Sequence, residues 1–305
     1  MEAAKFSEIL QKLESDKSSM QELNLALYLK ANYSDATDSG RNIPPLKHNQ
    51  IRSLFREIVL NNTTLKTLDL SGIRIDVTIM KELCVALKTT QIETLKLVNC
   101  KISTRSLRHL MHALPNVSTL KELYLAENQF VAKSVPYVMK YLACPECKLE
   151  TLSLSDNGLC DQGIEQMFKS LEQIGARSSL KTLRIANTSF SERGFKSIMA
   201  YLKCNLPLEV INMYDVLIPG DDDALKEEFL DVFRDNFYAK RIEIDQINLN
   251  VDQQARLQQI KTSKEGVGHH LYVTDVDALL DWPSSCVGAP VKTSCLCTGR
   301  AASAA

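Results

Sequence analysis

One repeated phrase organises this sequence. Aliphatic residues recur in the pattern LxxLxLxxN at steps of 27 to 31 residues between residues 65 and 208. The clearest copies, residues 120–128 and 149–157, both end in asparagine. Self-similarity at such a period predicts a solenoid, in which each unit packs only against its neighbours. A first copy is assigned to Leu27, Leu29 and Asn32, and eight others centre on Leu68, Leu95, Leu123, Leu152, Leu183, Ile211, Ile242 and Leu271.

A second pattern lies between these phrases. Apolar residues at i, i+3, i+4 and i+7, as at Leu107, Leu110, Met111 and Leu114, have the period of an amphipathic helix. The other stripes of this kind begin at Phe6, Ile51, Met80, Val135, Ile164 and Phe195. Because helix N-termini favour side chains that accept backbone N–H groups, we predict N-caps at Ser103, Ser134, Asp161 and Ser191.

Each repeat therefore combines a strand, a turn and a helix. No single unit can bury its apolar face alone, so stacking supplies the core. Strands stack about 4.8 Å apart, whereas helices need about 10 Å, so the helical side must fan out. The expected fold is a right-handed α/β solenoid of horseshoe shape, with a parallel sheet on the concave side and helices on the convex side.

The pattern resembles the ribonuclease-inhibitor-like class of leucine-rich repeats, which carry a helix on the convex side of repeats of about 28 residues. The ladder position holds Asn at Asn32, Asn128 and Asn157, but Ile73, Val216, Ile247 and Val276 depart from the pattern. The resemblance is specific for the fold. It is weak for function, because one fold carries many functions.

The domain organisation follows from these patterns. Residues 1–283 are predicted to form one solenoid of about nine repeats, with an N-terminal helical cap at 3–16 and a loop insertion at about 33–45. Residues 284–305 are small and aperiodic, so we expect a disordered tail. Cys286, Cys295 and Cys297 in this tail are either lipid acceptors or, more simply, stray cysteines.

Composition excludes several functions. The net charge is −1, which gives no general attraction to nucleic acid or an anionic membrane. No apolar stretch is long enough for a membrane span, and residues 1–17 lack the pattern of a secretory signal. Nine scattered cysteines indicate reduced thiols in a cytoplasmic protein. We expect no nucleic-acid partner, no membrane insertion and a monomer.

No enzyme or cofactor signature is present. The sequence contains no GxxxxGK[ST], HExxH or GxSxG motif, so we expect neither catalysis nor a cofactor. Cys144 and Cys147 form one Cys-x-x-Cys pair, but a structural zinc site needs four ligands. His109 and His112 on a predicted convex helix, and the acidic run at residues 221–235, are more simply explained as solvated surface than as a metal site and a docking patch.

The concave face is the predicted binding surface. Strand residues alternate, so those beside the buried leucines point away from the core. The central column is predicted as Tyr28, Asp69, Lys96, Tyr124, Ser153, Arg184, Asn212, Glu243 and Tyr272. Tyr and Arg dominate interface hot spots, so Tyr124, Arg184 and Tyr214 are the predicted anchors. With them we select Lys96 and Asn212, and the acids Glu127, Asp156 and Asp215 toward the ascending loops.

The predicted function is therefore a non-enzymatic protein-interaction module acting as scaffold, sensor or inhibitor. A surface about 40 Å long and 13 Å wide suits a protein better than a metabolite, which needs an enclosed pocket. Two alternatives follow from the resemblance: a Ran-type GTPase-activating protein and an actin-filament regulator of the tropomodulin-like kind. The basic, small-residue tail argues against the first, and the short N-terminal cap against the second.

Overall fold

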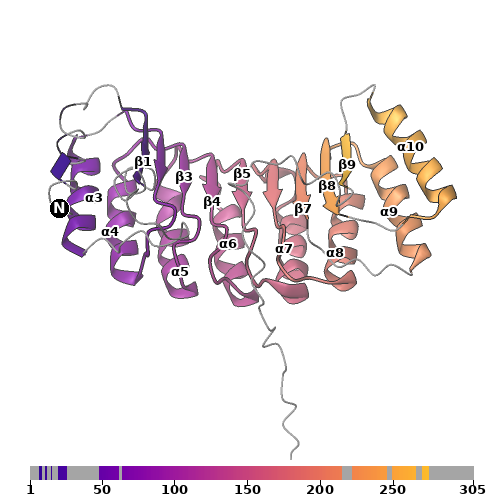
Figure 1. Cartoon of the computed structure of the whole chain (residues 1–305), viewed down its shortest axis with the longest axis horizontal. Helices are drawn as coiled ribbons and strands as arrows, with labels where there is room; N and C mark the ends of the chain where they lie inside the picture. Colours follow the sequence, from indigo (N-terminus) through magenta and orange to yellow (C-terminus); the bar gives the residue numbers. More distant parts are fainter. Residues whose placement is uncertain are drawn as a thin grey trace, which may run out of the picture.

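A computed structural model describes residues 7–8, 11, 15, 20–25, 48–61, 64–214, 222–245, 249–265 and 270–274. Across these residues, nine strands form one parallel sheet in strict sequence order. The strands lie on the inner side of a curved array and the helices on the outer side (Figure 1). This confirms the solenoid architecture. The strands are β1 (Glu22–Asn24), β2 (Thr67–Asp69), β3 (Thr94–Lys96), β4 (Glu122–Tyr124), β5 (Thr151–Ser153), β6 (Thr182–Arg184), β7 (Val210–Met213), β8 (Arg241–Asp245) and β9 (His270–Thr274).

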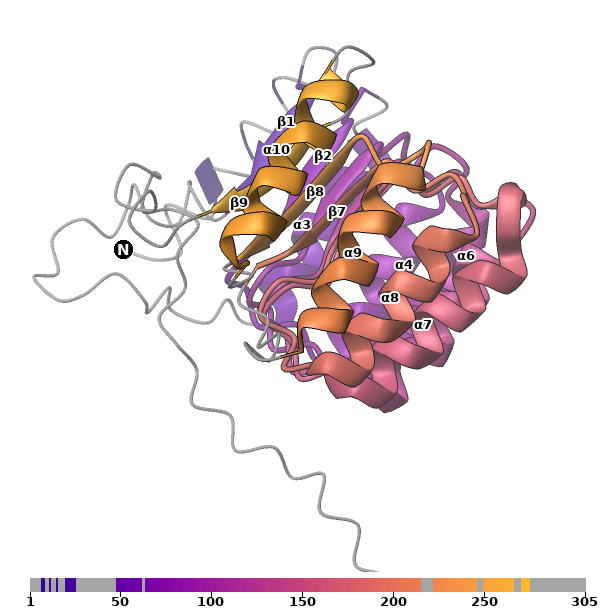
Figure 2. The ribbon, with the colours of Figure 1, turned by 90° about the vertical axis from the view of Figure 1, so that its right-hand side faces the viewer.

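The helices form a second layer behind the sheet, as the view along the solenoid shows (Figure 2). Each follows a strand in the chain and packs against the helices of the neighbouring repeats. They are α3 (His48–Asn61), α4 (Val77–Leu87), α5 (Thr104–Ala113), α6 (Val135–Leu142), α7 (Cys160–Ile174), α8 (Glu192–Lys203), α9 (Asp223–Asp235) and α10 (Val251–Glu265), with short 3-10 helices η1 (Leu114–Asn116), η2 (Ala132–Ser134) and η3 (Gly175–Arg177).

One continuous apolar core fills the space between the two layers. The central strand leucines are fully buried, and so is the stripe that begins at Leu107. The stripes that begin at Met80, Val135, Ile164 and Phe195 are buried as well. Full burial of such a side chain contributes about 1.5–3 kcal/mol, and neighbouring repeats supply the covering surface. The sequence periodicity therefore predicted the core correctly.

The first strand lies four residues earlier than predicted. β1 pairs Leu23 with Leu68, so Leu23 occupies the place assigned to Leu27. Leucines at 23, 25, 27 and 29 alternate with polar or small residues, and this period of two fits several frames equally well. Asn24 therefore replaces Tyr28 at the head of the concave column. Asn32, the loop insertion, the tail and most of the N-terminal cap lie outside the described residues.

A buried asparagine closes the turn after β4. The Asn128 Oδ1 accepts a hydrogen bond from the backbone N–H of Ile102 (2.9 Å), and its Nδ2 donates to the carbonyl oxygens of Leu97, Leu125 and Ala126 (2.8, 3.0 and 3.1 Å). Asn157 repeats this arrangement one unit later. The amide thus joins adjacent repeats through buried backbone groups, and it supplies the hydrogen bonds of the Ile102 N–H and the Leu97 carbonyl oxygen.

Two of the four predicted helix caps are correct. The Ser103 and Ser191 hydroxyls accept backbone N–H groups at the starts of α5 and α8. Ser134 makes no such bond to α6, because a 3-10 turn precedes that helix. Asp161 lies within the first turn of α7 and instead accepts the N–H groups of Ser191 and Gly194, in the next repeat, at 2.8 and 2.9 Å.

We expect Asp161→Asn to lower stability by about 1 kcal/mol at pH 6, and by less at pH 3. Partial burial raises the pKa of Asp161, but hydrogen bonds from Ser191 and Gly194 and the charge of Arg193 outweigh it, so the pKa is lowered. A lowered pKa gives stability that is present above the unfolded-state value and is lost as pH falls through the folded-state value. Denaturant titrations of both proteins at several pH values measure this difference. A difference that is independent of pH contradicts the assignment.

Candidate functional site

The concave column is built by the sheet register. Lys96, Tyr124, Ser153, Arg184 and Asn212 are direct neighbours on successive strands. The strand residue before each of them is buried against the helices, so this column faces away from the core. Lys96, Tyr124 and Asn212 are half-buried, and Arg184 is exposed. The structure therefore brings these four predicted residues onto one surface.

Tyr124 and Arg184 form the centre of this surface. They flank Ser153, which is only 4% exposed although it lies on the open face of the sheet. The Tyr124 hydroxyl donates a hydrogen bond to the Glu122 carboxylate (3.1 Å). Burial raises the pKa of Tyr124, Glu122 adds to the effect, and the positive charge of Arg184 opposes it. The Tyr124 phenol is therefore neutral and is held in place by Glu122. The Arg184 guanidinium lies two strands away.

Glu122 was missed in the sequence, although it belongs to this surface. It stands two residues before Tyr124 on β4, so the two side chains share a face by strand alternation. The alternation used to select Tyr124 could have found it. Its carboxylate fixes the orientation of the tyrosine and adds a negative charge beside it.

Glu127 and Asp156 lie in the turns that follow β4 and β5. Both have left-handed backbone conformations, with φ of 54° and 56°. The equivalent residues of other repeats are Gly72, Asn99 and Asn187, which tolerate this conformation well. Asp156 also accepts a hydrogen bond from the Asn187 side chain (2.8 Å). The left-handed backbone therefore explains why an aspartate stands at position 156. It does not explain the glutamate at position 127.

We expect Glu127→Asn to raise the free energy of unfolding by about 0.5–1 kcal/mol, because asparagine visits the left-handed region at lower cost. Asn99 has the same φ of 54°, so Asn99→Glu is the matched reverse change and should destabilise the protein by a similar amount. Urea unfolding measures both. Should Glu127→Asn lower stability, the Glu127 side chain must make a stabilising contact.

The distal end of the column is occupied by a polar network. Asn212 donates a hydrogen bond to Glu243 on β8, and Arg241 forms an ion pair with the same carboxylate. Glu243 is only 8% exposed, so its carboxylate interacts with Asn212 and Arg241 within the protein. Tyr214, just after β7, is half-buried. Asp215 lies outside the described residues, so its place beside Glu127 and Asp156 stays a prediction.

A ladder of alternating charge follows the edge where the strands begin. One residue per repeat contributes, and acids and bases alternate along the edge. Ion pairs join Lys66 to Glu93, Glu93 to Lys121, Glu150 to Lys181 and Glu209 to Lys240, at 2.5 to 2.9 Å. Hydrogen bonds from Lys121 and Lys66 lower the pKa of Glu93 to about 2. This edge of paired charges was not predicted, although the second position of each repeated phrase alternates between lysine and glutamate.

Known proteins share these repeats. A family model of the leucine-rich repeat matches residues 61–84 and 147–167. The mouse (Mus musculus) ribonuclease inhibitor is 30% identical over 162 residues, which cover 52% of this chain and 32% of that protein. The pig (Sus scrofa) ribonuclease inhibitor is 26% identical over 199 residues, covering 55% and 43%. The chain is a leucine-rich-repeat protein. Its repeats are of the ribonuclease-inhibitor-like class.

This leucine-rich-repeat protein is also similar to human NACHT, LRR and PYD domains-containing protein 14, at 30% identity over 153 residues, covering 48% of the chain and 14% of that protein. The matches thus span less than half the length of each of these relatives. The family indicates a protein-interaction module.

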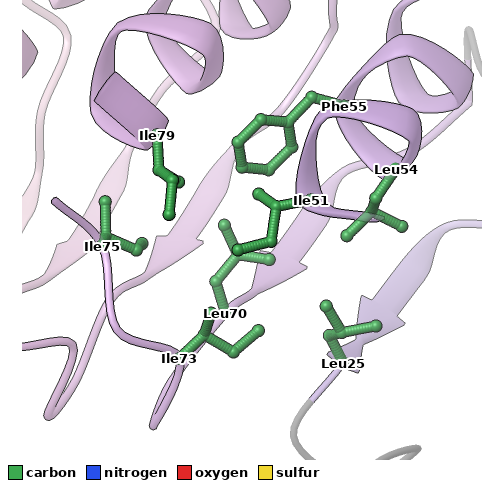
Figure 3. Close-up of a pocket in the computed structure, with 8 residues that line it drawn as sticks. All are labelled: Leu25, Ile51, Leu54, Phe55, Leu70, Ile73, Ile75 and Ile79. Carbon is green, nitrogen blue, oxygen red and sulfur yellow. The ribbon is translucent and has the colours of Figure 1, made fainter. Parts of the chain in front are cut away.

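Other candidate sites offer little chemistry. The apolar seam between α3, α4, β1 and β2 leaves no room for a ligand and is lined by hydrocarbon side chains alone, including Leu25, Phe55 and Ile73 (Figure 3). Burial raises the pKa of Cys84 to about 11 and that of Cys100 to about 12, so both thiols are inert core residues.

Within the described ranges, no cluster of three or more His, Cys, Asp or Glu could hold a metal ion. No helix in the same ranges is long and apolar enough to span a membrane.

Proposed function

We propose that this repeat protein binds a protein partner on its concave face and performs no chemistry itself. The proposal rests on three neighbouring residues of the concave column. The large side chains of Tyr124 and Arg184 flank the small side chain of Ser153 on the open face of the sheet. Aromatic and arginine anchors of this kind dominate the energetics of protein interfaces. Lys96, Asn212 and Tyr214, and the turn residues Glu127, Asp156 and Asp215, complete the proposed surface.

The relatives support a role of this class. Two of them are ribonuclease inhibitors by name, and inhibition is a function that binding alone can perform. For this chain we propose a scaffold, sensor or inhibitor that acts as a monomer in the cytoplasm, without a cofactor, nucleic acid or membrane insertion.

A variant with Tyr124, Arg184 and Tyr214 all changed to alanine tests the proposal. Partners captured by the wild type are identified by quantitative mass spectrometry, and the affinity of one purified partner is then measured with each variant. We expect about a hundredfold loss of affinity, since hot-spot residues cost about 2 kcal/mol or more each and their effects are not additive.

The matched control removes two aromatic rings and one arginine elsewhere. Phe237, Tyr238 and Arg177 are exposed away from the concave face. Their change to alanine should leave the affinity within about twofold, because exposed positions outside an interface contribute little. Binding that survives the concave change, or that fails with the control, places the partner on another surface.

The two alternatives are tested on purified proteins. A Ran-type GTPase-activating protein would accelerate GTP hydrolysis by Ran, so an unchanged rate at stoichiometric protein removes this alternative. An actin-filament regulator would change filament elongation or depolymerisation. Unchanged filament kinetics remove the second alternative and leave the binding module as the proposal.

A further inference from the structure

The convex surface carries an unbalanced group of positive charges. Six exposed basic residues lie on α4, directly after α4, on α5, on η2 and on α6. None of them forms an ion pair within the described part of the chain. Neither α5 nor α6 contains an acidic residue, and the single acid of α4, Glu82, is paired with Arg52 of α3 at 2.8 Å. We name this group the basic convex patch: Lys81, Lys88, Arg105, Arg108, Lys133 and Lys140.

Four of these bases lie on three helices that pack side by side, α4, α5 and α6, while Lys88 directly follows α4 and Lys133 lies on η2 just before α6. Arg105 and Arg108 are three residues apart on α5, so they project from the same side of the helix. Lys81 on α4 is close enough to act on His109 of α5. Partial burial lowers the pKa of His109, and positive charges around it lower the pKa further, those of Lys81, Arg108, Arg105 and His112.

The acidic helix α9 shows the opposite arrangement. Five of the six described acids of its run have a basic partner: Asp223 with Lys226, Glu227 with Arg256, Glu228 with Lys203, Asp231 with Arg256 and Arg234, and Asp235 with Arg234. The sixth, Asp222, caps the start of α9 by accepting the backbone N–H of Leu225 (3.0 Å). These contacts within the chain account for the described acids of the run. The positive surface over α4 to α6 has no such explanation within the described residues.

We propose that the basic convex patch binds an acidic segment of a partner protein, independently of the concave face. Charge complementarity selects an anion. An extended segment of about eight residues spans three helices placed about 10 Å apart, at about 3.3 Å per residue. A membrane would be anchored by large apolar side chains that insert, and the exposed large hydrophobic residues on or directly beside the elements of the patch are two valines, Val85 and Val131. Single-stranded nucleic acid would need exposed aromatic rings for stacking, and Tyr137, the aromatic residue beside the patch, is packed against the core.

An oligo-glutamate peptide of about eight residues is the probe, because its length matches the span of the patch. Binding to the full chain is measured by fluorescence anisotropy at low and at physiological salt. We expect affinity to fall as salt rises. The Arg105→Gln/Arg108→Gln variant should bind about five- to tenfold more weakly, because each lost charge pair at an exposed surface is worth a factor of a few.

The matched control is Lys169→Gln/Arg177→Gln. It removes two exposed bases near α7, outside the basic convex patch, and gives the same change in net charge. Affinity within about twofold of the wild type supports the proposal, since long-range charge alone is then too weak to explain the binding. Equal loss in both variants overturns it. Tighter binding to phosphatidylserine vesicles or to a single-stranded oligonucleotide than to oligo-glutamate also overturns it, because the patch would then serve another class of ligand.

Discussion

Asn128→Ala is expected to lower the free energy of unfolding by about 3–5 kcal/mol. The side chain is 2% exposed and satisfies one backbone N–H group and three carbonyl oxygens in two adjacent repeats. Each buried polar group left without a partner costs about 1–3 kcal/mol. Alanine removes all four contacts. The Leu125 and Ala126 carbonyl oxygens keep the hydrogen bonds that they accept from the Asn157 side chain and the Asn99 N–H, whereas the Ile102 N–H and the Leu97 carbonyl oxygen lose the bond that Asn128 supplies.

Cys100→Ala is the matched control for this change. Cys100 holds the same ladder position one repeat earlier and is fully buried, but its thiol donates only to the carbonyl oxygens of Leu70 and Val98 (3.2 and 3.5 Å). A thiol is a weak donor, so the expected loss is about 1 kcal/mol. Guanidinium unfolding monitored by circular dichroism compares the two. Equal losses would show that filling volume, rather than hydrogen bonding, governs the ladder position.

The architecture could be predicted from the sequence because its two periods are local and repeated. A strand phrase with a buried leucine at its centre, such as Leu123, and a helical stripe such as that from Leu107 to Leu114 each specify one face of one element. Repetition then removes ambiguity that a single copy would leave. The first strand shows the limit: four alternating leucines permit several frames, and only pairing with Leu68 selects Leu23.

Contacts between repeats were harder to predict than the elements. The position of Asp161 predicted a cap for its own helix, but its carboxylate reaches the next one, because stacked helix N-termini bring Ser191 and Gly194 within hydrogen-bond distance. The left-handed turn at Glu127 and the pairing of Glu93 with two lysines likewise depend on the path of the chain between units. From Asp69 onward the concave column is as predicted because the sheet register alone sets it, whereas Tyr28 at its head was wrong. The binding role of its members stays a proposal.

Phe195→Ala is expected to lower the free energy of unfolding by about 3–5 kcal/mol, as large buried aromatic residues do when truncated to alanine. Phe195 is 1% exposed on α8, and its ring packs against Phe229 of α9 with centroids 5.7 Å apart. In a solenoid, stability is nearly a sum of repeat terms and nearest-neighbour interfaces. The change therefore mainly weakens the interface between α8 and α9, which couples the last repeats to the earlier ones.

This location predicts how the Phe195→Ala protein unfolds. We expect amides of α9 and α10 to exchange hydrogen earlier than those of α4 and α5, and the denaturant transition to broaden or split into two. Hydrogen exchange with mass spectrometry resolves the two regions. Phe237→Ala, at a ring that is 76% exposed, should change stability by less than about 0.5 kcal/mol. A single sharp transition with uniform exchange in Phe195→Ala would mean that the solenoid unfolds as one cooperative unit, because coupling across α8 and α9 would then exceed the energy that the lost ring supplies.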